Sequence, residues 1–241
     1  MGFINSVPYV QHQIDICLKE FAEFCKVYID DIIVASVSFE EHLLHLDLLF
    51  NTLSRLNITL EPAKSYIRYL SVQLLSLHVN ALGMTTLEEK IKAITSIEFP
   101  ITLADIEHYL SLTGSLQHYI HNYVAKAAPL EDRKVLLLKQ SPVKGQAQHN
   151  FVQRTILNQS TPAEEESFKT LQHKFTQPLF LAHFSQDHQL YTELDTSKEN
   201  SHGAIVYHTK GNFLHSKPAT PPLQNTIEPI LFLSHQLTTA E

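Results

Sequence analysis

Two adjacent carboxylates, Asp30 and Asp31, separate two short apolar runs in the stretch from Val27 to Val34. Both runs are β-branched or aromatic and too short for helices, so they predict a β-hairpin with the acidic pair at or beside its turn. Adjacent carboxylates repel each other, and a divalent cation such as Mg²⁺, which takes oxygen ligands, would offset that repulsion. A solvated acidic turn is the alternative interpretation of the same stretch.

Other segments accompany the motif Tyr28-Ile29-Asp30-Asp31 in a fixed order along the chain. They are Gly2-Phe3-Ile4-Asn5-Ser6 running to Tyr9-Val10-Gln11, then Phe39-Glu40-Glu41-His42, Glu61-Pro62-Ala63-Lys64-Ser65 and Pro129-Leu130. Together they resemble the reverse transcriptase and RNase H region of the Pol polyprotein of gypsy-type LTR retrotransposons, of the type known from filamentous fungi. The resemblance covers nearly the whole chain.

This resemblance implies an RNA-directed DNA polymerase whose catalytic Mg²⁺ ions are bound by Asp30 and Asp31. It implies that Tyr28, Gln11 and Lys64 contact the nucleic acid, which is an RNA/DNA template–primer. In the RNase H-like part, the resemblance makes Asp195 the first catalytic and metal-binding carboxylate. The same likeness makes Gly2 to Gln11 part of the pocket for the incoming nucleotide.

An α+β fold follows from the resemblance and from the order of the predicted elements. A partial palm with the acidic hairpin and a primer-grip-like hairpin is expected at 1–80, and thumb-like helices at 81–130. Residues 131–162 lose periodicity and are rich in polar residues, which favours a linker. A truncated RNase H-like domain is expected at 163–241.

Hydrophobic periodicity predicts the helices and strands that must position these residues. It predicts helices at 9–24, 39–53, 87–97, 102–114, 116–128 and 164–175, and strands at 58–60, 66–75, 78–79, 190–196, 203–209 and 229–235. Capping-box spacings at Ser38 with Glu41 and at Thr102 with Asp105 mark two of the helix starts.

Composition restricts the function classes. The chain has 241 residues, 44% of them apolar, which is ample for a core. Its net charge is −7, whereas a simple nucleic-acid binder usually has a basic surface patch. Weak affinity for nucleic acid is therefore expected. No apolar run is long enough for a membrane span and no secretory signal is readable, which favours an intracellular protein.

Three details of the sequence carry separate expectations. His42 with His45, and His118 with His121, have a spacing that suits a metal, but no third ligand is evident. Solvent-facing side chains are therefore favoured for His42 and His45, and a structural role for His118 and His121. Ser76 occupies a turn position where the resembled family has Gly, so a positive φ there would strain the backbone. Ser at such Gly positions, and His where Arg is usual, favour a decayed repeat copy.

The resemblance also suggests what this chain does not supply. It places a third palm carboxylate upstream of Gly2 and further RNase H carboxylates beyond Glu241. We therefore expect a chain truncated at both ends, catalytically inactive by itself, with poorly protected strands from Leu190 onwards because covering helices are absent. A domesticated, non-catalytic module that binds nucleic acid or protein is the alternative function.

Overall fold

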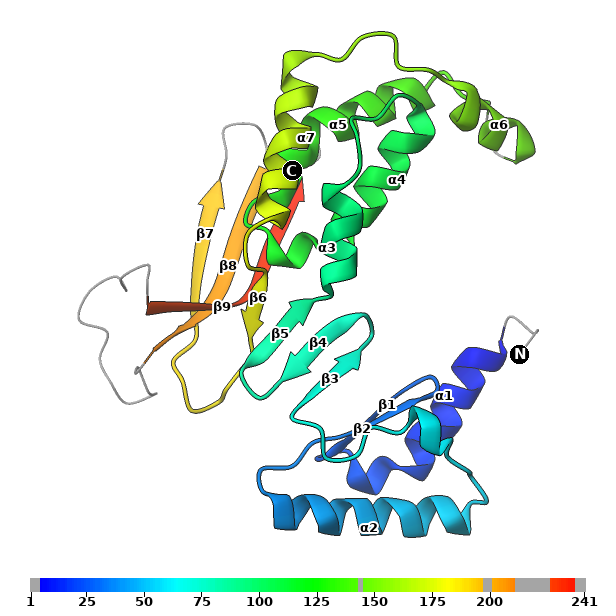
Figure 1. Ribbon diagram of the computed structural model, residues 1–241, viewed down its shortest axis with the longest axis vertical. Coiled ribbons are helices and arrows are strands. Elements are labelled where there is room, and N and C mark those ends of the chain that lie inside the picture. Colours follow the sequence, from blue (N-terminus) through cyan, green and yellow to red (C-terminus); the bar gives the residue numbers. More distant parts are fainter. Residues whose placement is uncertain (1–4, 143–144, 197–200, 211–225, 237–241) are drawn as a thin grey trace. The chain divides into compact units, whose positions relative to one another are not determined.

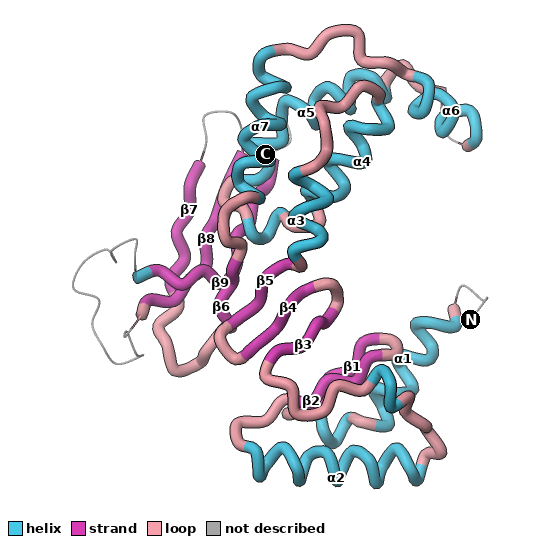
Figure 2. Tube along the Cα trace, viewed as in Figure 1, coloured by secondary structure: helices cyan, strands magenta, loops and turns pink. Residues whose placement is uncertain are grey.

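The computed structural model describes residues 5–142, 145–196, 201–210 and 226–236 (Figure 1). The chain divides into two compact units, an N-terminal unit of residues 1–67 and a C-terminal unit of residues 68–241. Helices and antiparallel sheets are both present, as Figure 2 shows, so the predicted α+β class is confirmed. The predicted nucleotide-pocket segment begins at Gly2, and its first residues lie outside the described ranges.

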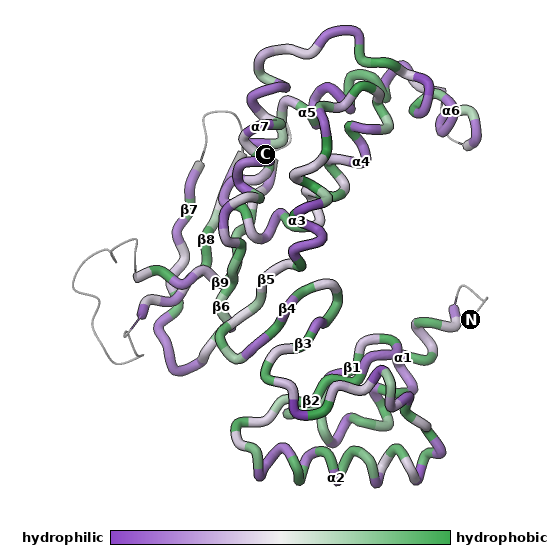
Figure 3. The backbone as a smooth tube through the Cα atoms, viewed as in Figure 1, coloured by the Kyte–Doolittle hydropathy of each residue, from purple (hydrophilic) through white to green (hydrophobic). Residues whose placement is uncertain are grey.

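The N-terminal unit is built around one hairpin and two helices. Its elements in order are α1 (Ser6–Cys17), the short 3-10 helix η1 (Lys19–Phe21), β1 (Cys25–Tyr28), β2 (Asp31–Val34), α2 (Phe39–Arg55) and the 3-10 helix η2 (Pro62–Lys64). Helix α2 starts at the predicted cap, where the Ser38 hydroxyl accepts a hydrogen bond from the Glu41 amide. Apolar and polar residues alternate along α2 (Figure 3), as expected for a helix with one buried side.

The core of this unit forms between the hairpin and the helices. Leu49 and Leu53 of α2 are buried together with Leu18 and Cys25. Alternate residues of the two strands, including Val27, pack onto the same cluster. One face of the hairpin is therefore held by apolar burial, and the residues of the opposite face point away from that core.

The C-terminal unit begins with a four-stranded antiparallel sheet and a helical layer. The strands are β3 (Ser71–Leu74), β4 (Leu77–Asn80), β5 (Gly83–Thr86) and β6 (Phe180–Ala182), in that order across the sheet. The helices are α3 (Glu88–Thr95), α4 (Leu103–Gly114), η3 (Gln117–Tyr119), α5 (Tyr123–Leu138), α6 (Gln146–Arg154) and α7 (Pro162–Phe175). Tyr109, Leu171 and Phe175 are fully buried where α4 and α7 meet.

A second antiparallel sheet completes this unit, with β8 between its two neighbours. It consists of β7 (Tyr191–Thr196), β8 (Ser201–Thr209) and β9 (Ile227–Gln236). One face contacts the segment from η3 to α5, where the His121 ring packs edge-on against Phe232. The expectation that these strands have no helical cover is therefore wrong for this face. On the opposite face, Leu194 is 79% exposed.

Several boundaries differ from those that periodicity predicts. No strand forms at 58–60, and β3 begins only at Ser71, because the intervening residues form the 3-10 helix η2 and bends. Helix α5 starts at Tyr123 instead of residue 116 and continues through Pro129, since Ala127 and Leu130 on either side are buried in the core. The end of α5 and all of α6 therefore occupy part of the interval predicted to be an irregular linker.

Two further differences concern the first helix and one strand. The helix predicted over 9–24 ends at Cys17 and is followed by a single 3-10 turn. Strand β6 was not predicted, because three residues are too short for a periodic signal and the strand exists only by pairing with β5.

Candidate active site at the acidic hairpin

The register of the hairpin determines which side chains face outward. Tyr28 pairs with Asp31, and Lys26 pairs with Ile33, so these four lie on the face opposite to the core. Tyr28 is 50% exposed. Asp30 lies in the two-residue turn rather than in a strand, so strand alternation does not place it on the face opposite to Asp31. Both carboxylates are exposed to solvent.

The turn itself has an unusual backbone. Ile29 has a φ of 55°, in the left-handed region that β-branched residues rarely adopt. Such conformations cost of order 1–3 kcal/mol and persist only when surrounding contacts enforce them. The residue directly before the acidic pair is therefore held in a strained state by its neighbours.

Gln11 of α1 supplies the contacts that hold this turn. Its Oε1 accepts a hydrogen bond from the Ile29 amide at 2.5 Å, and its Nε2 donates to the Val27 carbonyl at 3.1 Å. The same Nε2 is 2.9 Å from the Asp15 carboxylate, which fixes the orientation of the amide. In this structure Gln11 braces the hairpin turn, while its predicted contact with nucleic acid stays a prediction.

The base of the hairpin is anchored by residues for which sequence reasoning favoured a solvent-facing position. The Ser36 hydroxyl lies 2.8 Å from Nδ1 of His45 and 3.1 Å from Nδ1 of His42. The His45 ring stacks on Phe24, with centroids 3.6 Å apart and planes 2° from parallel. Both histidines are half-buried, so the prediction of solvent-facing side chains is wrong. Their spacing of three residues along a helix was the available signal, since it places them on one side.

Among the described residues, the acidic pair supplies the candidate ligands for a metal at the turn. Carboxylate oxygens suit Mg²⁺, and the two exposed groups of Asp30 and Asp31 offer such oxygens. Across the ranges that the structure describes, no group of three His, Cys, Asp or Glu side chains is arranged to hold a metal. Further ligands would have to come from water, substrate or residues outside these ranges.

The remaining predicted site residues lie elsewhere. Lys64 ends η2 and is exposed. Asp195, near the end of β7 in the C-terminal unit, has its Oδ2 atom 2.6 Å from Nδ2 of Asn122, which donates a hydrogen bond to it. Asp195 thus contacts the start of helix α5.

Comparison with known proteins agrees with the hairpin geometry. Residues 1–99 match the family model described as reverse transcriptase (RNA-dependent DNA polymerase). The Pol polyprotein of the Drosophila melanogaster transposon opus is 32% identical over 130 residues, which is 54% of this chain and 13% of that protein. Residues 1–99 are therefore similar to the reverse transcriptase region of retrotransposon Pol polyproteins. The predicted resemblance is therefore confirmed.

Other relatives of the reverse transcriptase region extend the match. The Tf2-3 transposon polyprotein of Schizosaccharomyces pombe is 22% identical over 197 residues, covering 81% of this chain and 13% of that protein. The gypsy transposon Pol polyprotein of Drosophila melanogaster is 28% identical over 132 residues, covering 54% of this chain and 13% of that protein. This chain spans about one eighth of the length of each of these relatives.

Solved structures share the fold of this chain. A foamy viral protease-reverse transcriptase in complex with dsDNA aligns with a TM-score of 0.74 at 20% identity, over all of this chain and 44% of the viral one. The same viral protein in complex with an RNA/DNA hybrid aligns with a TM-score of 0.71 at 20% identity, over 99% of this chain and 28% of the viral one. Within the residues that the structure describes, no helix combines the length and apolarity needed to cross a membrane.

Proposed function

We propose that the hairpin from Cys25 to Val34 is the catalytic hairpin of a retrotransposon polymerase, acting on an RNA/DNA template–primer. The observation that carries this proposal is the solvent-exposed position of Tyr28, Asp30 and Asp31 at a strained turn that Gln11 braces. Strain held by surrounding contacts is typical of functional positions. The relatives that carry matching sequence are transposon Pol polyproteins.

In this proposal, Asp30 and Asp31 would hold Mg²⁺, which would supply positive charge to stabilise the phosphates during nucleotide transfer. Gln11 keeps the turn in its strained conformation, so that the two carboxylates stay in place. Tyr28, beside Asp31 on the outward face, offers a flat surface to the primer strand. Lys64 supplies a positive charge for the backbone of the nucleic acid.

We also infer that these 241 residues, assayed by themselves, do not extend a primer. The described residues offer two carboxylates at the hairpin and no group of three metal ligands. Phosphoryl transfer depends almost wholly on positioning and charge stabilisation, so an incompletely held metal slows it about tenfold for each 1.4 kcal/mol lost. The net charge of −7 also predicts weak binding to a template–primer.

Moving the hairpin into an active polymerase tests the role of the hairpin separately from the primer-extension activity of the whole chain. The stretch Val27 to Val34 replaces its counterpart in an active retrotransposon polymerase, and primer extension is measured with Mg²⁺. We expect this chimaera to retain activity and the Asp30→Asn, Asp31→Asn version to lose at least about 100-fold. Ile33→Val, on the same outward face of the grafted stretch, is the matched control and should retain activity. Activity in the double Asn chimaera would overturn the proposal.

A parallel assay uses the 241-residue protein itself with Mg²⁺ or Mn²⁺. Incorporation no greater than that of its Asp30→Asn, Asp31→Asn variant is the expected result. Incorporation above that background would contradict the inferred inactivity while leaving the assignment of the hairpin in place.

A further inference from the structure

One face of the three-stranded sheet contacts the start of helix α5. The register pairs Asp195 with Gly203 and Gly203 with Ser234, so these three residues share a face. The amide of Val124, in the first turn of α5, donates a hydrogen bond to the Ser234 hydroxyl at 3.2 Å. The helix start therefore meets the sheet at the row of residues that contains Asp195.

Asn122 occupies the centre of this contact. It is the N-cap residue of α5, but its side chain does not cap the helix, and its φ is 52°, in the left-handed region. Its Nδ2 donates to Asp195 Oδ2 at 2.6 Å, and its Oδ1 is buried with no hydrogen-bond partner among the described residues. Rotating the amide would bring the oxygen against the carboxylate, so the donor has to face Asp195.

The sheet is shaped to receive this side chain. A Cβ atom built on Gly203 would lie 1.5 Å from Asn122 Oδ1 and 2.6 Å from its Cγ. No residue other than glycine leaves room for the amide in its present position. Gly203 and Asn122 are thus complementary across the contact, although they lie far apart in the sequence.

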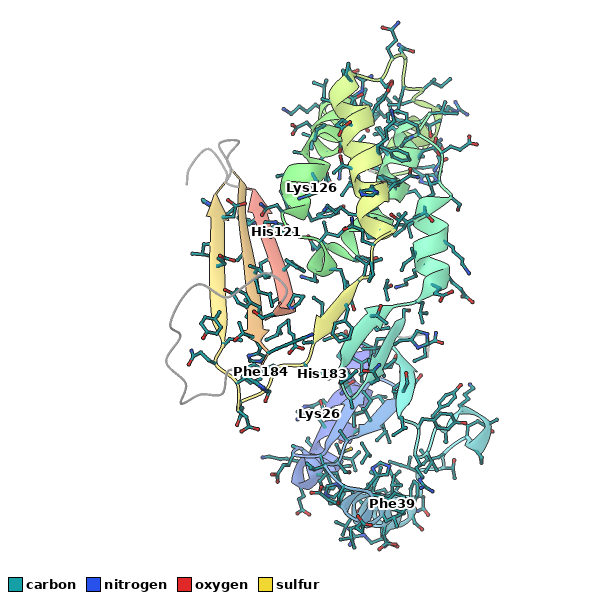
Figure 4. All side chains as sticks on the ribbon, turned by 60° about the vertical axis from the view of Figure 1, so that its left-hand side comes forward. Lys26, Phe39, His121, Lys126, His183 and Phe184 are labelled. Atoms are coloured by element: carbon teal, nitrogen blue, oxygen red, sulfur yellow. The ribbon has the colours of Figure 1, made fainter. Side chains whose placement is uncertain are left out.

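The charges around Asp195 also suit docking. Lys126, half-buried in α5, donates from Nζ to the His121 carbonyl at 2.6 Å (Figure 4). Burial lowers the pKa of Lys126 and of His121, whereas the nearby Asp195 acts to raise both. The N-terminus of α5 adds a partial positive charge from its unpaired amides. Asp195 therefore faces an amide donor, two side chains that can carry positive charge, and a helix N-terminus.

These surroundings do not fit a divalent metal. A magnesium site gathers carboxylates and retains several waters. Here one oxygen of Asp195 is bonded to an amide. Beside the carboxylate of Glu193, the neighbours include Lys126 and His121, which are cationic when protonated. Throughout the described ranges no three-residue ligand group is present.

We propose that Asp195 is a docking residue, which together with Asn122 and Gly203 latches the N-terminus of α5 onto the three-stranded sheet. The latch joins the helical layer to the sheet through one charge-assisted hydrogen bond and one close-packed side chain. It assigns Asp195 a positioning role that differs from the metal-binding role implied by the family resemblance. It is independent of the hairpin in the N-terminal unit.

Hydrogen exchange of the Val124 amide is the direct test, because that amide bonds to Ser234 only while the latch is closed. In the 241-residue protein, Asn122→Ala and Asp195→Ala should each speed its exchange roughly 10- to 100-fold, as expected for loss of a hydrogen bond to a charged group. Asp195→Asn keeps an acceptor oxygen for Asn122 and should speed exchange less than about tenfold.

Gly203→Ala opens the latch without altering either partner's chemistry, and the same acceleration is expected. Gly114→Ala is its matched control, since a Cβ there would lie 3.6 Å from the nearest atom, the Tyr123 hydroxyl. Additive effects of Asn122→Ala and Asp195→Ala in a double-mutant cycle would overturn the latch.

A titration with Mn²⁺ distinguishes a docking role of Asp195 from a metal-binding role. Mn²⁺ is titrated into the protein, and paramagnetic broadening of the amides of β7 is recorded. If Asp195 is a docking residue, Mn²⁺ should cause no broadening that is both centred on Asp195 and abolished by Asp195→Asn. Such broadening, combined with unchanged Val124 exchange in Asp195→Ala, would assign Asp195 to a metal site and refute the proposal. Circular dichroism spectra of all variants establish that each is folded.

Discussion

At the scale of single residues, strained backbone positions lie at the turns of two hairpins, β1–β2 and β3–β4. Ile29 precedes the acidic pair, and Leu75 and Ser76 form the two-residue loop between β3 and β4, with φ values of 48° and 66°. A loop with positive φ at both central positions is a type I′ turn, which favours Asn and Gly. Sequence reasoning anticipated the strain at Ser76, and the structure confirms its positive φ.

Ser76→Gly should stabilise the protein by about 1 kcal/mol, because glycine adopts positive φ without a Cβ clash. Urea unfolding of the parent and the variant measures the difference. Ser71→Gly, within strand β3, is the matched control and should destabilise by about 0.5–1 kcal/mol through added chain entropy. Equal effects of the two changes would mean that the turn is not strained.

The strain at Ile29 was not predicted, although the turn was. Nothing in the run of apolar residues around Asp30 and Asp31 shows which of the central residues must be left-handed. The contact that enforces it comes from Gln11, which is 18 positions away. Residue type and spacing thus identified the acidic pair, but the brace that holds it depends on tertiary packing.

At the scale of secondary-structure elements, capping residues predicted a helix start more reliably than hydrophobic periodicity predicted helix ends. Helix α4 starts at the predicted capping box, in which the Thr102 hydroxyl accepts from the Asp105 amide and the Asp105 carboxylate accepts from the Thr102 amide at 2.8 Å. Periodicity was less reliable at helix ends: α5 passes through Pro129 because the residues around it are buried. Strand β6 had no local signal, because its partner is distant in sequence.

The cap of α4 predicts a pH-dependent stability. Burial acts to raise the pKa of Asp105, but hydrogen bonds from Thr102 and Ile101 outweigh it and leave that pKa below its usual value. The ionised carboxylate therefore stabilises the fold. Its contribution is complete above the unfolded-state pKa of about 4 and is lost as the pH falls through the lower folded-state pKa.

Asp105→Ala should cost about 1 kcal/mol at pH 7, and the difference from the parent should shrink as the pH falls through the lowered folded-state pKa of Asp105. Urea unfolding at a series of pH values follows both proteins. Asp132→Ala, an exposed carboxylate within α5, provides the control and should change stability little at any of these pH values. A cost for Asp105→Ala that is constant with pH would contradict the ionic cap.

At the scale of the whole molecule, the family resemblance and the α+β class followed from the sequence. The division into units of residues 1–67 and 68–241 did not, because contacts between distant segments decide it. The C-terminal unit is closed by the pairing of Gly83 in β5 with Ala182 in β6. A Cβ on Gly83 would lie 2.2 Å from the Leu181 carbonyl oxygen, a backbone atom that has no freedom to rotate away.

Gly83→Ala should therefore destabilise the C-terminal unit by roughly 1–3 kcal/mol, the usual cost of overpacking. Amide exchange in Phe180 to Ala182 should accelerate in the same variant, because the pairing of β5 with β6 has to open. Gly114→Ala, in helix α4, should be neutral or mildly stabilising. Unchanged exchange in β6 would show that the strands tolerate a methyl group between them.

The pairing of β5 with β6 has a consequence for synthesis on the ribosome. Strand β5 leaves the ribosome roughly 100 residues before β6, which is about 5–20 s at ordinary rates of elongation. During that interval the edge of β5 lacks its native neighbour and is open to pairing with another nascent chain. The helices from α3 to α7 have to assemble beside this open edge, so correct folding of the C-terminal unit depends on how soon its last segments are made.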